Sequence, residues 1–195
     1  DPSFSLEIVA TNIDGPMDAF LIDMDQDGDM DIISASYGDN TTRWFENNGN
    51  KATPSFNGYN IFTSIGARGV HAEDIDGDGD IDIAVAGGTD NVVQWYENNG
   101  SQSFSKHHIA SCDNAESIFV TDLNSDGELD ILYACPSDNK IAWGHNVRDD
   151  NNDRFNARTI CLNCSGAYSV YAADIDNDGD MDILAAARDE DKIYW

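Results

Sequence analysis

The hydrophobic positions of this chain recur in four similar blocks, and each block predicts short β-strands rather than helices. Two apolar runs of strand length flank an acidic loop in every block. A third segment alternates apolar and polar positions up to a tryptophan, as a half-buried strand requires. The four tryptophans are Trp44, Trp95, Trp143 and Trp195. A fourth segment with the pattern F-x4-[IV] precedes each loop, and its copies are Phe4 to Val9, Phe56 to Ile61, Phe104 to Ile109 and Phe155 to Ile160.

These four blocks predict one all-β domain, a β-propeller built of four-stranded antiparallel blades. Repeats of roughly 40–50 residues with four strands each are typical of propeller blades. We place the repeats at about 1–51, 52–100, 101–150 and 151–195, within a single domain of residues 1–195. The tryptophans are interpreted as core residues between blades rather than as platforms for stacking sugars.

Each acidic loop has the form D-x-[DN]-x-D-G-[DE]-x-D and predicts a calcium site. Calcium takes roughly six to eight oxygen ligands, and acids at alternate positions of a tight loop can point inward together. Glycine at position 6 permits the positive φ of a sharp turn. We expect side-chain ligands from positions 1, 3, 5 and 9, and a carbonyl ligand from position 7, whose own carboxylate then faces solvent. The predicted ligands are Asp23, Asp25, Asp27, Asp29 and Asp31; Asp74, Asp76, Asp78, Asp80 and Asp82; Asp122, Asn124, Asp126, Glu128 and Asp130; and Asp174, Asp176, Asp178, Asp180 and Asp182.

An EF-hand or a magnesium site fits these loops less well. The EF-hand also opens with D-x-D-x-D-G, but it needs a bidentate Glu at position 12 and flanking helices. Position 12 is occupied here by Ser34, Val85, Tyr133 and Ala185. Magnesium is disfavoured because it retains several waters. The third loop has Asn124 in place of an acid, so we expect it to bind calcium most weakly, within a total of about four ions, one per repeat.

The overall charge agrees with bound cations and argues against nucleic-acid binding. Acidic residues outnumber basic ones 37 to 10, for a formal net charge of -27. Such a surface repels phosphate backbones. The 41% apolar content argues for a packed interior rather than disorder. No stretch approaches the roughly 20 apolar residues of a membrane span, so we expect no membrane insertion.

Cysteines and sequons point to an extracellular setting. Cys112, Cys135, Cys161 and Cys164 make an even count, which favours disulfides and an oxidising compartment. The C-x-x-C of the last two leaves redox activity and half of a zinc site as alternatives, and free buried thiols are a further one. Sequons at Asn40, Asn99 and Asn163 permit glycosylation. The chain starts at Asp1 without Met and shows no signal peptide, so we interpret it as a mature or trimmed product.

The combination of the acidic loop, the following apolar strand and W-[FY]-E-N-N-G resembles the FG-GAP/VCBS repeat, the blade unit of integrin-α-like propellers. The resemblance covers nearly the whole chain. It implies that calcium ions brace the blade hairpins and that ligands meet the opposite rim. Propellers of this kind commonly have about seven blades. We therefore favour four repeats of a longer propeller, with a closed four-bladed ring, completed by Phe4 to Val9, as the alternative.

The rim opposite the acidic loops carries the candidate ligand-binding residues. It is expected to hold small-residue turns around Gly15, Gly66, Ala115 and Gly166, and polar turns near Asp39, Asp90, Asp138 and Asp189. Residues there differ between repeats, a variation that can build a ligand surface, although unselected drift of loop residues gives the same pattern. The candidates are Arg68, His71, Glu116 and Tyr168. For His71, which replaces an aromatic residue of the other repeats, a buried structural histidine is the favoured interpretation.

The sequence therefore predicts a secreted or cell-surface binding, adhesion or scaffold module that presents this rim to a protein or glycan. No catalytic motif or catalytic residue is identified. An enzyme acting on polysaccharides, such as a lyase or dehydratase, is the first alternative, with Arg68 and His71 as its contributors. A structural repeat of a surface filament or sheath, which self-assembles, is the second.

Overall fold

The computed structural model describes residues 6–51, 53–148 and 154–195, which form four antiparallel β-sheets. The first sheet contains β1 (Pro16–Ile22), β2 (Asp31–Ser36), β3 (Thr41–Asn47) and β4 (Phe56–Thr63). The second contains β5 (Ala67–Glu73), β6 (Asp82–Gly87), β7 (Val92–Asn98) and β8 (Phe104–Ser111). The third contains β9 (Ser117–Thr121), β10 (Asp130–Cys135), β11 (Lys140–Asn146) and β12 (Phe155–Cys161). The fourth has three strands, β13 (Ala167–Ala173), β14 (Asp182–Ala187) and β15 (Lys192–Tyr194), with a 3-10 turn at Arg188–Glu190.

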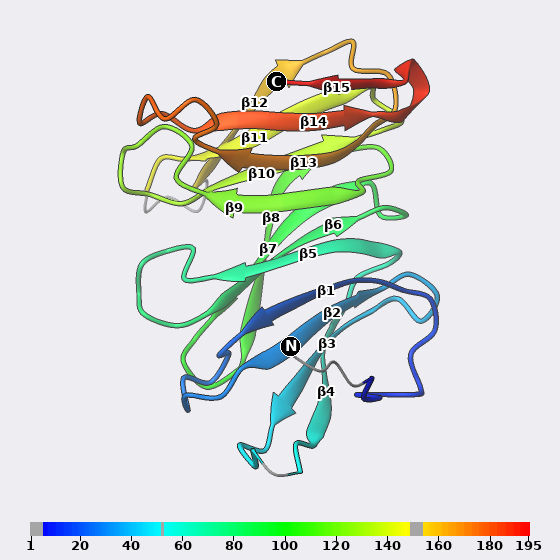
Figure 1. Ribbon diagram of the computed structural model, residues 1–195, viewed down its shortest axis with the longest axis vertical. Coiled ribbons are helices and arrows are strands. Elements are labelled where there is room, and N and C mark those ends of the chain that lie inside the picture. Colours follow the sequence, from blue (N-terminus) through cyan, green and yellow to red (C-terminus); the bar gives the residue numbers. More distant parts are fainter. Residues whose placement is uncertain (1–5, 52, 149–153) are drawn as a thin grey trace, which may run out of the picture.

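Each sheet is a meander, as expected for a propeller blade, but its boundaries are offset from the sequence repeats. The outer strands β4, β8 and β12 begin at Phe56, Phe104 and Phe155. Each F-x4-[IV] segment therefore completes the blade of the preceding repeat. The innermost strands pack side by side in the order β1, β5, β9 and β13 (Figure 1). The predicted all-β fold of propeller-type blades is confirmed.

The alternative of a closed four-bladed ring is wrong. The first and fourth sheets lie at opposite ends of the stack in Figure 1. Phe4 lies outside the described residues, and Leu6 to Val9 form no strand. In the described part of the chain, β15 pairs only with β14.

The hydrophobic core lies between blades rather than inside any one of them. Three clusters fill the three boundaries between successive sheets. Trp44 is 8% exposed between the first two sheets, and Trp95 is 3% exposed between the second and third. Trp143 packs partly buried at the third boundary. The interpretation of these three tryptophans as core residues is confirmed, whereas Trp195 is 71% exposed.

All four cysteines form disulfides, Cys112–Cys135 and Cys161–Cys164. The alternatives of free thiols and of a zinc half-site are therefore wrong. The first bond joins the turn after β8 to the end of β10, and the second closes the turn after β12. Among the described residues, no helix is long and apolar enough to cross a membrane.

Candidate functional site

The four acidic loops lie on one rim, at the left in Figure 1, where each joins the first two strands of its sheet. The first two loops touch each other: the Gln26 side-chain amide donates to the carbonyl of Gly79, 2.5 Å away. The turns that follow β3 and β7 reach the same rim, because the backbone N–H of Asn47 donates to Asp31 and that of Asn98 to Asp82. The expected distribution of turns between the two rims is confirmed.

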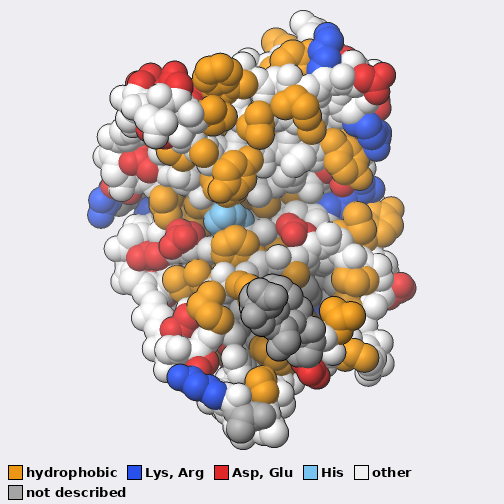
Figure 2. Space-filling view, viewed as in Figure 1, with side chains coloured by type: hydrophobic (Ala, Val, Ile, Leu, Met, Phe, Trp, Pro, Cys, Tyr) orange, Lys and Arg blue, Asp and Glu red, His pale blue; other side chains and the backbone are white. Residues whose placement is uncertain are grey.

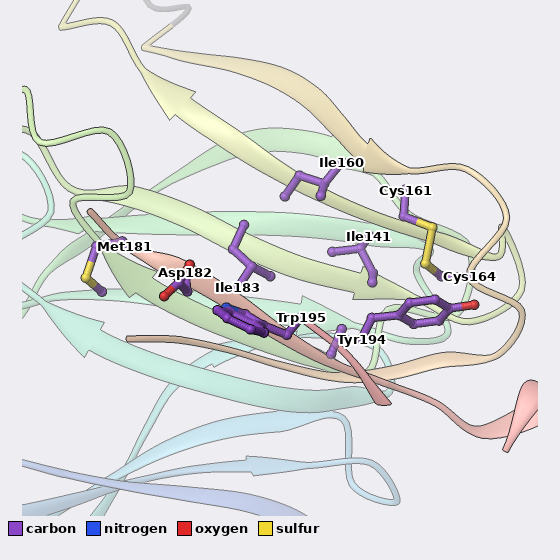
Figure 3. A pocket seen from close by; sticks show the side chains of 10 residues that line it. Ile141, Ile160, Cys161, Cys164, Met181, Asp182, Ile183, Tyr194 and Trp195 are labelled. Atoms are coloured by element: carbon purple, nitrogen blue, oxygen red, sulfur yellow. A yellow bond between two sulfur atoms is a disulfide. The ribbon is translucent and has the colours of Figure 1, made fainter. Parts of the chain in front are cut away.

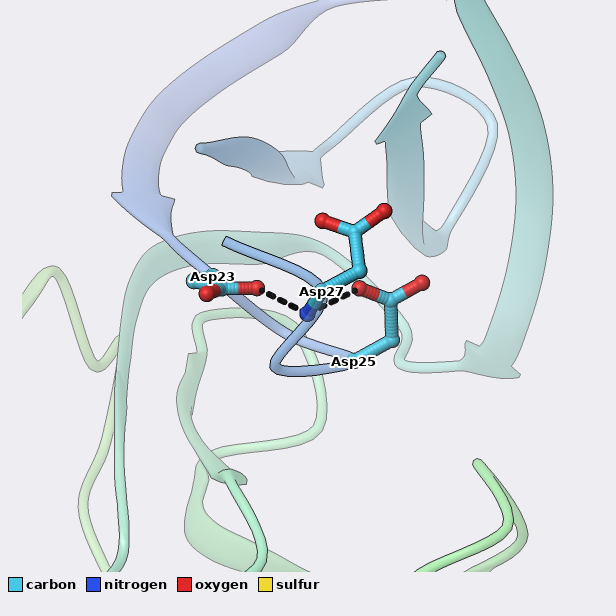
Figure 4. Close-up of side chains that lie close together, drawn as sticks. All are labelled: Asp23, Asp25 and Asp27. Atoms are coloured by element: carbon cyan, nitrogen blue, oxygen red, sulfur yellow. Dashed lines mark hydrogen bonds between the residues drawn. The ribbon is translucent and has the colours of Figure 1, made fainter. Parts of the chain in front are cut away.

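The carboxylates of each loop shape its backbone. Asp27 donates its backbone N–H to Asp23 at 3.0 Å and to Asp25 at 3.3 Å, as Figure 4 shows. The position-6 glycine then donates to the position-1 carboxylate, and the distance from Gly28 to Asp23 is 2.9 Å. All four loops repeat this last bond, at 2.8–3.1 Å. Gly28 has φ +96°, a left-handed conformation that glycine adopts without a Cβ penalty.

Carboxylate oxygens converge in three of the loops. The trios whose oxygens lie within 4.8 Å of one another are Asp23, Asp25 and Asp27; Asp74, Asp76 and Asp78; and Asp174, Asp176 and Asp182. Within the described residues, the third loop forms no such trio of acids, since Asn124 occupies its third position. Donor sets made only of oxygen suit a hard divalent cation such as calcium.

The position-9 aspartates are buried braces, a role that the sequence did not reveal. Asp31, Asp82 and Asp130 are at most 1% exposed. One carboxylate oxygen accepts the position-2 N–H, at 3.1 Å in each of these three loops. The other accepts a backbone N–H from the last residue of the third strand, at 2.7–2.8 Å. Burial raises the pKa of Asp82 to about 7 and the pKa of Asp130 to about 6.

The position-7 carboxylates differ from the expected solvent-facing arrangement. Asp29 and Asp80 lie against the glycines of the Glu-Asn-Asn-Gly turns, and a Cβ added at Gly100 would sit 2.6 Å from an Asp80 oxygen. Glu128 instead forms an ion pair with Arg148, at 2.6 Å. Only Asp180, in the fourth loop, is classed as exposed. In the first two blades, a side chain at the turn glycine would therefore collide with the position-7 carboxylate of the loop.

Three asparagines that sequence reasoning treated only as turn formers hold each loop to its turn. In each case the side-chain amide donates a hydrogen bond of 3.1 Å to the carbonyl of loop position 8, and the asparagines are Asn47, Asn98 and Asn146. The amide of Asn146 also donates to the Ile75 carbonyl of the preceding blade, at 3.3 Å. The signal available in the sequence was their recurrence at a fixed distance after Trp44, Trp95 and Trp143.

The third loop differs from the others in its surroundings as well as in Asn124. His145 stands where the first two repeats have Glu46 and Glu97. Its Nε2 lies 3.3 Å from Oδ2 of Asp126, one of the predicted ligands. This loop therefore has fewer negative charges, and one of its carboxylates already has a partner.

The opposite rim does not bring the four candidate ligand-binding residues together. Arg68 forms an ion pair with the buried Glu116, and its guanidinium lies 4.9 Å from the centre of the Tyr37 ring. Tyr168 instead stacks with Arg188, at 4.8 Å. Arg68 thus bridges the first three repeats, and its charge is already paired.

His71 belongs to an aromatic row along the inner strands. Its ring lies 4.3 Å from that of Phe20 and 5.1 Å from that of Phe119. The side chain is buried, and desolvation lowers its pKa to about 4. The favoured interpretation, a buried structural histidine, is confirmed.

The sequon asparagines Asn40 and Asn163 differ in their surroundings. The side chain of Asn40 accepts the backbone N–H of Gly66 at 2.9 Å, and Asn40 has φ +57°. This asparagine therefore has a structural role between the first two blades. Asn163, by contrast, is exposed.

Comparison with known proteins agrees with the geometry. The FG-GAP-like repeat matches residues 23–85, 74–133 and 122–185, each time from one acidic loop past the next. No curated protein matches the sequence significantly. The crystal structure of the V. cholerae biofilm matrix protein Bap1 has a similar fold, with a TM-score of 0.51 and 16% sequence identity. That similarity covers 94% of this chain but only 30% of Bap1, so the chain spans less than a third of that protein's length. The matched repeats extend over most of the sequence, and the chain belongs to the FG-GAP-like repeat family.

Proposed function

We propose that each acidic loop binds one calcium ion and that these ions brace the blades. The ligands would be the carboxylates or amide at positions 1, 3, 5 and 9 and the carbonyl at position 7 of each loop. The observation that carries this proposal is the convergence of carboxylate oxygens within 4.8 Å in three separate loops. Without a cation, such groups repel one another, and a bound divalent ion would offset that repulsion.

Calcium bound there would act on the whole stack. Three of the four loops are tied by their position-9 aspartates to the end of the third strand, and the first two loops are joined by the contact of Gln26 with Gly79. A cation that orders one loop therefore also orders the sheet and supports its neighbour.

Isothermal titration of chelator-treated protein with calcium tests this role. We expect up to four sites per chain, and Asp78→Ala should remove one of them. Glu73→Ala, which changes an acid of β5 next to the second loop but outside the proposed ligand set, is the matched control. Loss of a site in Glu73→Ala, or full retention in Asp78→Ala, would contradict the ligand assignment.

We further propose that the braced propeller is an adhesion or scaffold module that works outside the cell. Two disulfides support an oxidising compartment. The biofilm matrix protein with a similar fold supports a matrix or surface role. The rim opposite the loops, with the exposed Ile65 and Tyr37, would contact a protein or glycan. The two residues named for an enzymatic alternative have structural surroundings, since Arg68 is paired with Glu116 and His71 is buried.

Glycan and matrix-protein arrays probed with the calcium-loaded chain test the recognition role. Binding that is lost in Tyr37→Ala but kept in Tyr59→Ala, an exposed residue of the outer strand β4, would support the rim. Binding lost equally in both variants would place recognition elsewhere.

A further inference from the structure

We propose that the third acidic loop prefers zinc, or a divalent transition metal of similar chemistry, to calcium, because the imidazole of His145 adds a nitrogen ligand to it. The loop comprises residues Asp122 to Asp130 and runs from the end of β9 to the start of β10. This preference rests on the proposed function, cation binding by the acidic loops, and specifies the class of ion that one of them takes. The proposed ligands of the other three loops are all oxygens.

The third loop keeps the backbone arrangement that gathers ligands in the first loop. The backbone N–H of Asp126 donates to Asp122 at 3.1 Å and to the side-chain oxygen of Asn124 at 2.9 Å. The position-5 N–H of the first loop makes the same two bonds, at 3.0 Å and 3.3 Å, and the carboxylates of that loop converge within 4.8 Å. Positions 1 and 3 of the third loop therefore present their oxygens side by side, one from a carboxylate and one from a neutral amide.

A histidine nitrogen joins these oxygens. Nε2 of His145 lies 3.3 Å from Oδ2 of Asp126, the position-5 carboxylate. Two ligand atoms at roughly 2.0–2.1 Å from one tetrahedral zinc ion are about 3.4 Å apart, so the observed spacing suits a shared ion. The equivalent positions of the first two blades are Glu46 and Glu97, which offer oxygen instead of nitrogen. The nitrogen donor is therefore particular to the third of these three blades.

The ring of His145 is held facing the loop. Its side chain is 16% exposed, and the ring lies 5.0 Å from that of Trp143, which precedes it by two positions on the same face of β11. Its Nδ1 is buried and has no hydrogen-bond partner among the described residues. The orientation of the ring is therefore set by its contact with Trp143 and by the loop itself, so Nε2 is already directed at the position-5 carboxylate.

The type of donor decides which ion such a site prefers. Acidic side chains recur down the left side of Figure 2, where the loops lie, and this rim attracts divalent cations of any kind. Calcium takes oxygen ligands, whereas imidazole suits zinc and related transition metals. Asp122, Asp126 and His145 would supply three ligands of a four-coordinate zinc ion, and Asn124 or water would supply the fourth. The changes that weaken this loop for calcium thus leave a set of nitrogen and oxygen donors that suits zinc.

Two other features of the chain make the preference testable. No thiolate competes for zinc, because all four cysteines form disulfides, of which Cys161–Cys164 is drawn in Figure 3. A second histidine–carboxylate pair lies on the second blade, where Nε2 of His107 is 2.8 Å from Glu97. Neither residue of this pair belongs to the proposed ligands of a loop. Any zinc affinity that a histidine beside a carboxylate confers by itself should therefore appear at both pairs.

Isothermal titration with zinc in the presence of excess calcium tests the preference. We expect the wild-type chain to bind one zinc ion and His145→Gln to weaken that binding by roughly 10-fold or more, with an unchanged melting temperature in EDTA showing that the fold is intact. His107→Gln is the matched control and should bind zinc as the wild type does. Cobalt(II), added in place of zinc, should give a visible absorption band that His145→Gln loses and His107→Gln keeps.

The outcomes separate this preference from the proposed function. Calcium sites without a zinc site, or zinc binding that His145→Gln retains in full, would overturn the preference and leave calcium binding by the other loops standing. Equal losses in His145→Gln and His107→Gln would also overturn it, because they would show adventitious binding by histidine. A chain that binds neither ion would refute both proposals.

Discussion

The carboxylate of Asp82 accepts a hydrogen bond of 2.7 Å from the backbone N–H of Asn98, which ties the second acidic loop to the end of β7, where the Glu-Asn-Asn-Gly turn begins. The first and third blades repeat this bond between Asp31 and Asn47 and between Asp130 and Asn146. Loop and turn are therefore one unit in three of the four blades. Anything that orders the loop also stabilises the end of the sheet.

Removing this brace should be costly. Asp82→Ala leaves the N–H groups of Asn98 and Ile75 without their acceptor in a buried setting, so we expect a loss of about 3 kcal/mol in the free energy of unfolding. Asp182→Ala is the control, because Asp182 is half-buried and its described backbone partner is Ile175 alone. Its loss should be about 1 kcal/mol. Urea unfolding with chelator present separates these values from any effect of metal, and equal losses would refute the bracing role.

The asparagine that crosses a blade boundary gives a second prediction. Asn146→Ala removes amide bonds to the carbonyls of Leu129 and Ile75, the first in a partly buried and the second in a buried environment. We expect a loss of about 2 kcal/mol, measured by urea unfolding. Asn156→Ala, at an exposed position of the outer strand β12, should change stability by less than about 0.5 kcal/mol. A neutral Asn146→Ala would show that the link between loops is unimportant.

The sequence predicted the loops and the blades because both follow from local patterns. Alternate acids followed by glycine specify a tight loop, and period-2 apolar runs specify strands. Contacts between distant residues were not predictable in this way. The pairing of Arg68 with Glu116 and the choice of disulfide partners depend on how blades stack, and four cysteines alone allow three pairings. The closed ring was wrong for the same reason, because the arrangement of successive blades depends on contacts between repeats and not on the sequence of any one repeat.

The third loop should be the weakest calcium site. Asn124 is neutral and His145 already contacts Asp126, so the loop attracts a cation less strongly than its neighbours. In a calcium titration, Asn124→Asp should raise the affinity of the weakest binding step, which we assign to the third loop. Asn163→Asp adds the same charge at an exposed site on the far rim and should leave that step unchanged. Four equal sites in the wild type would contradict this prediction.

His71 should make the fold sensitive to mild acid. Its pKa is lowered from 6.5 to about 4 by burial, so its contribution to stability is present above pH 6.5 and is lost as the pH falls toward 4. Phenylalanine, which the first and third repeats have at this position, does not titrate. We therefore compare the free energies of unfolding of His71→Phe and the wild type, measured with urea. The variant's advantage should be about 1 kcal/mol larger at pH 5.5 than at pH 8. An equal difference at both pH values would show that His71 is not buried as a neutral ring.

Thermal unfolding with and without a chelator tests most directly whether calcium braces the blades. Cations that bind only the folded chain raise its stability with each occupied site. We predict that EDTA lowers the melting temperature by more than about 10 °C and that excess calcium restores it, whereas excess magnesium does not. A melting temperature that is the same in EDTA and in calcium would contradict the bracing role of calcium.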